Sequence, residues 1–157
     1  MKKFLDLVKD SLTEVRERMP WDLAARRREN PELLIIDVRE PAEFDAMHIP
    51  GSINVPRGIL ESACDWGYEE TIPELAAARE REIAVVCRSG YRSILAVHSL
   101  QLLGYHNAFS LKTGVRGWND AEQALVDNHG KMVAPDQADV FFTPRLRPEQ
   151  LGPADSS

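Results

Sequence analysis

The sequence predicts a single α/β domain, in which strands alternate with helices and a central parallel sheet carries helices on both faces. Short apolar runs near residues 33, 53, 83 and 108 have the length and composition of buried strands. The stretches between these runs are long enough for the helical crossovers that parallel strands require. A length of 157 residues fits one such domain.

The first element is a predicted N-terminal helical extension, residues 1–20. Apolar residues recur there at intervals of three and four, which places them on one face of a helix that ends at Pro20. We expect this face to pack on the protein's own core, and contact with a partner or a second copy is the alternative. The apolar positions are Phe4, Val8, Leu12, Val15 and Met19.

After the N-terminal extension, the sequence predicts helices and strands in alternation. Residues 21–28 predict a second short helix, and residues 33–39 form an apolar run that turns polar at its end, as a strand of a parallel sheet does. Pro41 then opens a helix, because the missing proline N–H costs nothing in a first turn. A short strand is expected near residue 53, and the alanine-rich residues 73–81 predict another helix.

The strongest strand covers residues 83–86 and leads directly into a turn that contains Cys87. Ser93 is the predicted N-cap of the apolar helix that follows, over residues 94–103. The last helix of the domain is expected to begin at Asn119.

Cys87 is the predicted nucleophile. In a strand-to-helix turn, backbone N–H groups and the positive end of the helix dipole converge on the sulfur, and Arg88 and Arg92 add two positive charges. These surroundings favour an ionised thiol, so we expect a reactive thiolate. The alternative is a buried, inert cysteine at the end of a strand.

The length of the cysteine loop narrows the chemistry. An arginine lies five positions after Cys87, whereas cysteine phosphatases have it six positions after, where this chain has Ser93. The ring of N–H donors is thus too short for a phosphate and suits a single sulfur bound to the cysteine. At this point the chain resembles the rhodanese-like sulfurtransferase family, whose single-domain members carry Cys-Arg-x-Gly-x-Arg, matched at Cys87, Arg88, Gly90 and Arg92.

An upstream segment is similar to the family's signature Asp-x-Arg, Glu-Phe and His-Ile-Pro-Gly-Ser-x-Asn, and its charged and polar members are supporting residues. We expect them to brace the strand ends through charge-assisted hydrogen bonds, and the alternative places Asp37 and Arg39 on the pocket floor. These supporting residues are Asp37, Arg39, Glu43 and His48.

The resemblance covers residues 21–126, which we interpret as the domain, and residues 127–157 are a C-terminal extension. The apolar residues 140–142 are expected to anchor this extension onto the domain or onto a second chain. The chain departs from the family pattern twice. Met47 stands where the family has glycine, and Thr113 replaces the first glycine of a Gly-Gly pair, which is expected to re-aim the pocket rim.

The resemblance implies a thiosulfate sulfurtransferase that works by double displacement and needs no cofactor. Cys87 takes a sulfur from thiosulfate or a related anionic donor and then passes it to cyanide, a thiol or an acceptor protein. The residues expected to bind the donor are Arg88, Ser89, Gly90, Tyr91 and Arg92, with Ser93 in support.

Other functions stay open at this point. A sulfur-relay or partner-binding module would share the motif without efficient thiosulfate turnover. A cysteine phosphatase or arsenate reductase would use the same nucleophile, although the loop length argues against it. A homodimer could form through the two terminal extensions.

The composition excludes several classes of partner. A net charge of −6 argues against nucleic acid and anionic membranes, because both need a basic face. Asp6 interrupts the apolar start, so no export signal is expected. Two cysteines without a disulfide framework favour a reducing, cytoplasmic compartment. An alternative role for the second cysteine, Cys64, is that of a resolving thiol for Cys87. The cysteines and four scattered histidines lack metal-ligand spacing.

Overall fold

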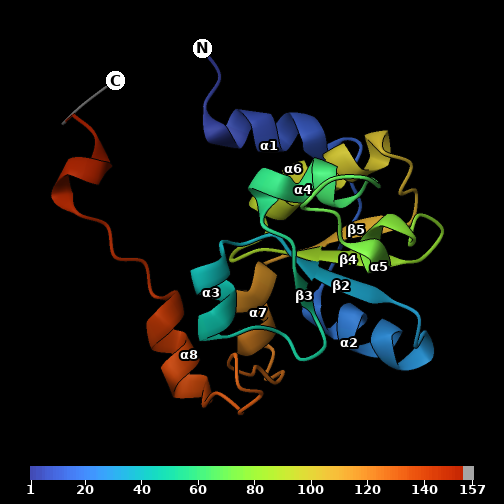
Figure 1. The fold of residues 1–157 in the computed structure, drawn as a ribbon. Helices are drawn as coiled ribbons and strands as arrows, with labels where there is room; N and C mark the ends of the chain where they lie inside the picture. The colour runs from blue at the N-terminus through green and yellow to red at the C-terminus, as the bar shows by residue number, and fades with distance from the viewer. Residues whose placement is uncertain (154–157) are drawn as a thin grey trace.

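The computed structural model describes residues 1–153 and has a five-stranded parallel sheet at its centre (Figure 1). The predicted fold class is confirmed. The spatial order is β1-β5-β4-β2-β3, so the strand that precedes Cys87 is the middle one. The strands are β1 (Glu17–Arg18), β2 (Leu34–Asp37), β3 (Ile53–Asn54), β4 (Ile83–Val86) and β5 (Ala108–Leu111).

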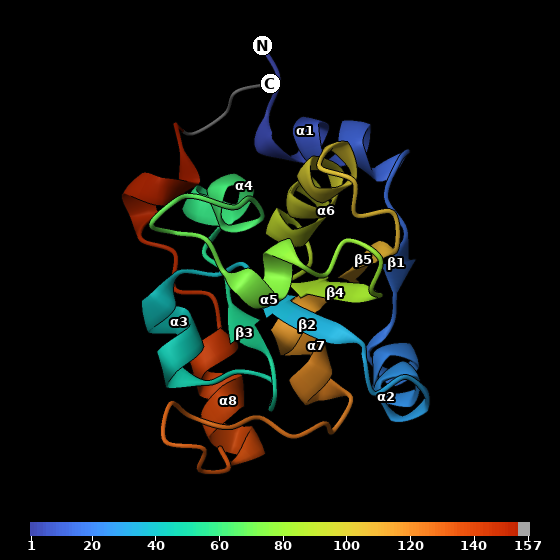
Figure 2. The ribbon, with the colours of Figure 1, turned by 45° about the vertical axis from the view of Figure 1, so that its right-hand side comes forward.

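Helices cover both faces of the sheet. They are α1 (Phe4–Leu12), α2 (Pro20–Glu29), α3 (Pro41–Ala46), α4 (Leu60–Ala63), α5 (Pro73–Ala76), α6 (Arg92–Leu102), α7 (Gly114–Asp120) and α8 (Pro135–Phe142), with the 3-10 turns η1 (Arg57–Ile59) and η2 (Pro148–Leu151). One layer holds α1, α4, α5 and α6, and the other holds α2, α7 and α8 (Figures 1 and 2). No helix within the described residues is long and apolar enough to cross a bilayer.

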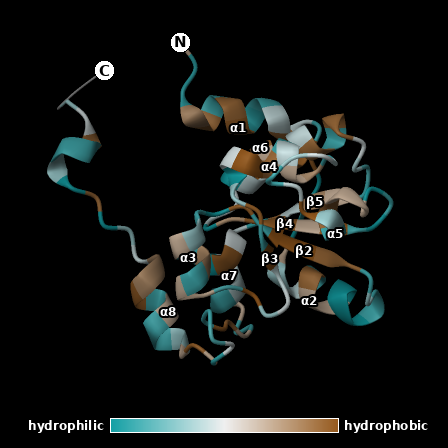
Figure 3. Cartoon of the chain, in the orientation of Figure 1, coloured by the Kyte–Doolittle hydropathy of each residue, from teal (hydrophilic) through white to brown (hydrophobic). Residues whose placement is uncertain are grey.

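Alternate strand residues supply the two cores. Leu34, Ile36 and Val85 pack with the layer of α1 and α6, whereas Ile35 and Ala84 pack with the layer of α2 and α7. Since successive side chains of a strand point to opposite faces, a continuous apolar run is what a sheet covered on both sides requires. Figure 3 shows these central strands as the apolar centre of the molecule.

The first helix is shorter than predicted. α1 ends at Leu12, and the chain then extends into β1, in which Glu17 pairs with Ser110 and Arg18 with Leu111. The predicted continuation of the helix to residue 19 is therefore wrong. Two charged residues carry no strand signal, and β1 exists because β5 offers it an edge to pair with.

The start of α6 also differs from the prediction. Its N-cap is Tyr91 and its first residue is Arg92, so Ser93 lies inside the first turn and is not the cap. The Ser93 side chain is fully buried, and its hydroxyl bonds to groups outside the helix. The helix predicted over residues 73–81 is reduced to α5, which ends at Ala76.

α7 begins at Gly114, five residues before the predicted start at Asn119. Glycine has a low helix propensity, so the two glycines of this segment gave no indication that the helix begins before Asn119. A Cβ on Gly114 would lie 2.4 Å from the Arg88 carbonyl oxygen, and one on Gly117 would lie 1.7 Å from Thr113 Oγ1. Close packing therefore requires glycine at both positions.

Candidate active site

Cys87 lies at the carboxyl end of β4, the middle strand of the sheet, and α6 begins five residues later at Arg92. Parallel α/β sheets bind ligands at this edge, because the loops there lead into helix N-termini. The central position of β4 gives Cys87 neighbours from both sides of the sheet, and the site is built from them.

The loop after Cys87 presents backbone N–H groups. The Gly90 amide donates a hydrogen bond to Cys87 Sγ at 3.1 Å, with Gly90 in the left-handed conformation at φ 96°. Among residues 1–153, the amides of Ser89, Tyr91 and Arg92 have no hydrogen-bond acceptor. Unpaired amides in a turn form a concave site that favours anions. The residues that carry these unpaired amides also line the hollow at the sulfur, so the amides are available to an anion bound there.

The N-terminus of α7 fixes the orientation of this loop. Val115 N–H donates to the Cys87 carbonyl at 2.8 Å, and Arg116 N–H donates to the Arg88 carbonyl at 3.0 Å. Because these two carbonyls accept hydrogen bonds from α7, they do not compete with an anion at the sulfur for the N–H donors of the loop. Because α7 approaches the loop so closely, a Cβ on Gly114 would lie only 2.4 Å from the Arg88 carbonyl oxygen.

Two buried serines lie behind the cysteine. Cys87 Sγ and Ser93 Oγ are 3.3 Å apart, and Ser93 Oγ is 2.7 Å from Ser110 Oγ on β5. Both serines are fully buried, so water does not compete for these hydroxyls. A hydroxyl donates to a thiolate and accepts from a thiol, so Ser93 can partner either form of the sulfur.

A hollow of about 240 Å³ opens at the sulfur. Cys87 itself is only 1% exposed, whereas Phe4 and Tyr91 at the rim are 50% and 48% exposed. These two rings meet edge to face with centroids 6.2 Å apart. The sulfur is accessible to a slender group that enters the hollow. The lining residues are Phe4, Cys87, Arg88, Ser89, Tyr91 and Arg92.

The two loop arginines have different partners. Arg92 Nη1 and Nη2 each donate to the Glu43 carboxylate at 3.0 Å, whereas Arg88 Nη2 donates to the Phe142 carbonyl at 2.7 Å. Burial alone would raise the pKa of Glu43, but hydrogen bonds from Arg92 and from the Glu40 amide outweigh burial and hold that pKa below its usual range. Glu43 therefore neutralises Arg92, whereas a neutral carbonyl leaves the charge of Arg88 in place.

The other expected supporting residues lie beneath the site. Asp37 and Arg39 form a fully buried ion pair, with Arg39 Nη2 2.7 Å from Asp37 Oδ2 and 2.7 Å from the Met47 carbonyl. His48 Nδ1 lies 2.8 Å from the Phe44 carbonyl, and its ring stacks on Phe44. None of these side chains lines the hollow at the cysteine. Their positions are those of braces between β2 and α3.

A model of the rhodanese-like domain matches residues 20–121. The chain belongs to the rhodanese-like domain family. Its sulfurtransferase relatives include the adenylyltransferase and sulfurtransferase MOCS3 of Drosophila virilis, which is 38% identical over a segment covering 59% of this chain and 20% of that protein. A Schizosaccharomyces pombe protein named as a mitochondrial thiosulfate sulfurtransferase is 34% identical, over 64% of this chain and 72% of that protein.

A third relative of this rhodanese-like domain is the Bacillus subtilis protein YrkF, named as a sulfur carrier protein. It is 31% identical over 55% of this chain and 41% of that protein. The chain thus spans about a fifth of MOCS3 and two fifths of YrkF. Sulfur transfer and sulfur carriage are both represented among its relatives.

Solved structures agree with the family and the fold. The thiosulfate sulfurtransferase of Pseudomonas aeruginosa has a TM-score of 0.62 and 26% identity, over 85% of this chain and 25% of that chain. A rhodanese-related protein of Thermoplasma volcanium has a TM-score of 0.58 and 28% identity, over 71% of this chain and 97% of that one.

Three contributors to the rhodanese-like site were missed by sequence reasoning. The apolar spacing predicts a core role for Phe4, but the structure places it at the rim of the hollow. Ser110 is a lone hydroxyl in an otherwise apolar strand, and that pattern was a usable signal. The contact of Arg88 with Phe142, in the C-terminal extension, has no local signal, because 54 positions separate the two residues.

Neither Cys64 nor Thr113 lines the hollow at the sulfur. Cys64 is fully buried at the end of α4, where burial raises the pKa of its thiol. It does not line the hollow at Cys87, so the geometry does not favour a resolving role. Thr113 adopts φ 71° and lines a neighbouring hollow with Arg116, and Ser89 belongs to both this hollow and the one at Cys87.

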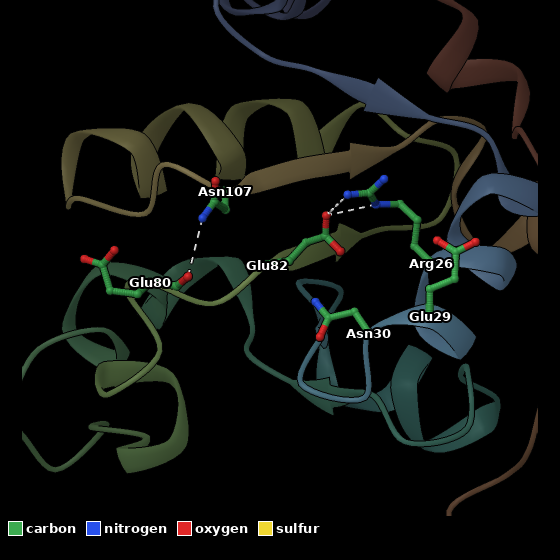
Figure 4. A pocket seen from close by; sticks show the side chains of 6 residues that line it. All are labelled: Arg26, Glu29, Asn30, Glu80, Glu82 and Asn107. Carbon is green, nitrogen blue, oxygen red and sulfur yellow. Dashed lines mark hydrogen bonds and ion pairs between the residues drawn. The ribbon is translucent and has the colours of Figure 1, made fainter.

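Another hollow of the rhodanese-like domain, about 380 Å³ in volume, lies away from Cys87 (Figure 4). It sits at the amino ends of β4 and β5, next to Glu82 and Asn107, on the opposite edge of the sheet from Cys87. Arg26 is paired there with Glu82. No cluster of three or more potential metal ligands occurs among residues 1–153.

Proposed function

We propose that this rhodanese-like domain is a sulfurtransferase that carries sulfur as a persulfide on Cys87. One observation carries the proposal: the Gly90 amide donates to Cys87 Sγ at 3.1 Å, and the residues of the same loop that have unpaired amides, Ser89, Tyr91 and Arg92, line the hollow at the sulfur together with Arg88. This arrangement stabilises a sulfur anion and supplies positive charge to attract an anionic donor.

The reaction is a double displacement. The Cys87 thiolate attacks the outer sulfur of thiosulfate, the S–S bond of the donor breaks, and sulfite leaves with the bonding electrons. The persulfide anion then occupies the amide loop. In the second step cyanide or a thiolate attacks the outer sulfur, and the Cys87 thiolate is the leaving group. Covalent catalysis of this kind gives ping-pong kinetics.

Within this proposal Arg88 and Arg92 have different roles. Arg88 holds the oxyanion end of the donor, because its charge is not neutralised by a carboxylate among residues 1–153. Arg92 braces the loop through Glu43. Arg88→Ala should therefore raise KM for thiosulfate more than Arg92→Ala does, and Arg92→Ala should lower stability more.

The test is intact-mass measurement after incubation with thiosulfate. We expect one added sulfur, its loss on adding cyanide, and its absence in Cys87→Ser. Cys64→Ser is the matched control and should load like the wild type. No added sulfur, or an adduct that survives in Cys87→Ser, would overturn the proposal.

A sulfur relay is the second candidate. The 1% exposure of Cys87 and the exposed rings of Phe4 and Tyr91 suit delivery of sulfur by a partner protein, and YrkF is named as a carrier. Loading rates from thiosulfate, mercaptopyruvate and a protein persulfide discriminate the two. Fast loading from the protein alone would favour the relay.

Phosphatase or arsenate reductase action is a weaker candidate, since the loop from Cys87 to Arg92 has six residues. Turnover of an aryl phosphate by the wild type would favour it. Thiol chemistry of the proposed kind needs a reducing compartment, so the cytoplasm remains the proposed location.

A further inference from the structure

A second hollow of about 330 Å³ adjoins the cysteine site, and the C-terminal extension forms most of it. Arg88 lines both hollows. The Arg92–Glu43 ion pair also joins them, because Arg92 lines the first hollow and Glu43 lines the second. The residues of the second hollow are Glu43, Arg88, Phe141, Thr143 and Arg145.

The extension is held in place at this hollow. Phe142 is buried in the core that contains α2 and α7, and its carbonyl accepts the hydrogen bond from Arg88. Asn119 Nδ2 donates to Asp139 Oδ1 at 2.7 Å, which ties α8 to α7. In Figures 1 and 2 the chain after α8 continues past α3, the helix that carries Glu43. These contacts anchor α8 beside the cysteine loop, and Arg145 follows three residues after the end of this helix.

The second hollow is cationic. Neither Arg88 nor Arg145 forms an ion pair with a carboxylate among residues 1–153, and Glu43 is already neutralised by Arg92. Two unpaired guanidinium groups therefore face one neutralised carboxylate, in a protein whose net charge is −6. Guanidinium binds carboxylates through paired N–H donors, and the exposed part of Phe141 adds apolar surface for a carbon chain.

Thiosulfate is too short to explain this hollow. Its charges lie next to the sulfur that is transferred, so it uses only the amide loop and Arg88. The second hollow, about 330 Å³, reaches by itself the size of sites for organic ligands, roughly 300–1,000 Å³.

We propose that the second hollow is a subsite for the carboxylate of an organic thiol that accepts sulfur from Cys87, and that Arg145 determines this specificity. This inference rests on the proposed persulfide chemistry. The thiolate of the ligand attacks the outer sulfur of the Cys87 persulfide, the S–S bond to Cys87 breaks, and the Cys87 thiolate leaves. One S–S bond replaces another, so no oxidant or reductant is consumed.

The experiment measures single-turnover discharge of the persulfide by intact mass. The probes are two pairs of thiols that differ only in carboxylate or amide: 3-mercaptopropionate with 3-mercaptopropanamide, and 6-mercaptohexanoate with 6-mercaptohexanamide. The measured quantity is the carboxylate-to-amide rate ratio of each pair. Comparing this ratio between variants removes the intrinsic reactivity of the thiols.

Arg145→Gln should lower the ratio for at least one pair by roughly fivefold to tenfold, the value of one charge-assisted contact in a partly exposed site. Arg145→Glu should lower it further, and added salt should reduce the wild-type ratio. Arg147→Gln is the matched control, because Arg147 pairs with Glu149 and does not line the hollow. It should keep the wild-type ratio. An unchanged ratio in Arg145→Gln for both pairs would overturn the subsite.

Loading the cysteine in two ways separates this inference from the proposed function. Persulfide is installed in parallel with thiosulfate and with inorganic polysulfide. Loading by polysulfide alone would reject the thiosulfate reaction, and the ratio would still decide the subsite. Loading of Cys87 by neither reagent would reject both.

Discussion

The guanidinium of Arg92 meets the carboxylate of Glu43 in a two-point contact, Nη1 to Oε2 and Nη2 to Oε1, each at 3.0 Å. The pair joins the first turn of α6 to α3. It thus connects the helix that follows the cysteine loop to the supporting segment after β2.

Glu43→Gln should lower the free energy of unfolding by about 1 kcal/mol at pH 7, because the charge-assisted contact with Arg92 is half-buried. The pKa of Glu43 is held below its usual range in the folded protein. Its contribution is therefore complete above the unfolded pKa of about 4.3 and is lost as the pH falls through the lower folded value.

Urea denaturation at pH 7 and near pH 3 checks this dependence. Glu61→Gln is the matched control, since Glu61 pairs with Arg57 on a more exposed surface, and about 0.5 kcal/mol or less is expected there. A deficit in Glu43→Gln that stays the same at both pH values would show that the ion pair is not its cause.

The two thiols should differ in reactivity. Iodoacetamide should alkylate Cys87 in the native protein, because Cys87 lines a hollow, and should spare Cys64, which is fully buried and has a raised pKa. Peptide mapping before and after unfolding in urea locates the labels. Native labelling at Cys64, or equal labelling at both positions, would contradict the site geometry.

Ser93→Ala should slow native alkylation of Cys87 by roughly tenfold, since a hydrogen bond to a charged group contributes about 1.5–3 kcal/mol. Ser110→Ala should have a smaller effect, because Ser110 touches Ser93 and not the sulfur. Both alkylation rates are measured at a fixed pH by quenching the reaction at successive times. Equal effects of the two substitutions would argue against a direct role of the Ser93 hydroxyl.

Gly114→Ala should cost about 2–4 kcal/mol of stability and displace the cysteine loop. Its φ is 65°, and the new Cβ would lie 2.4 Å from the Arg88 carbonyl oxygen. Gly58→Ala is the control, because nothing lies within 4 Å of a Cβ there, and a change within about 0.5 kcal/mol is expected. Thermal unfolding compares the two, and similar values would reject the close packing of α7 on the loop.

The apolar pattern was sufficient to predict the three central strands of the sheet. The apolar runs near residues 33, 83 and 108 are strands β2, β4 and β5. They are recognisable because a strand that is buried on both faces consists of consecutive apolar residues. The position of Cys87 after β4 was predicted for the same reason. In contrast, β1 was missed, because its extended form depends on pairing with Ser110 and Leu111.

The sequence by itself determined the fold class, the central strand and the cysteine loop, since these depend on local composition and spacing. Tertiary structure decided which partner each arginine has: Glu43 for Arg92 and the Phe142 carbonyl for Arg88. It also decided that α7 starts at Gly114, against the helix propensity of glycine. Contacts between residues distant in the chain are set by how elements pack, and no local pattern encodes them.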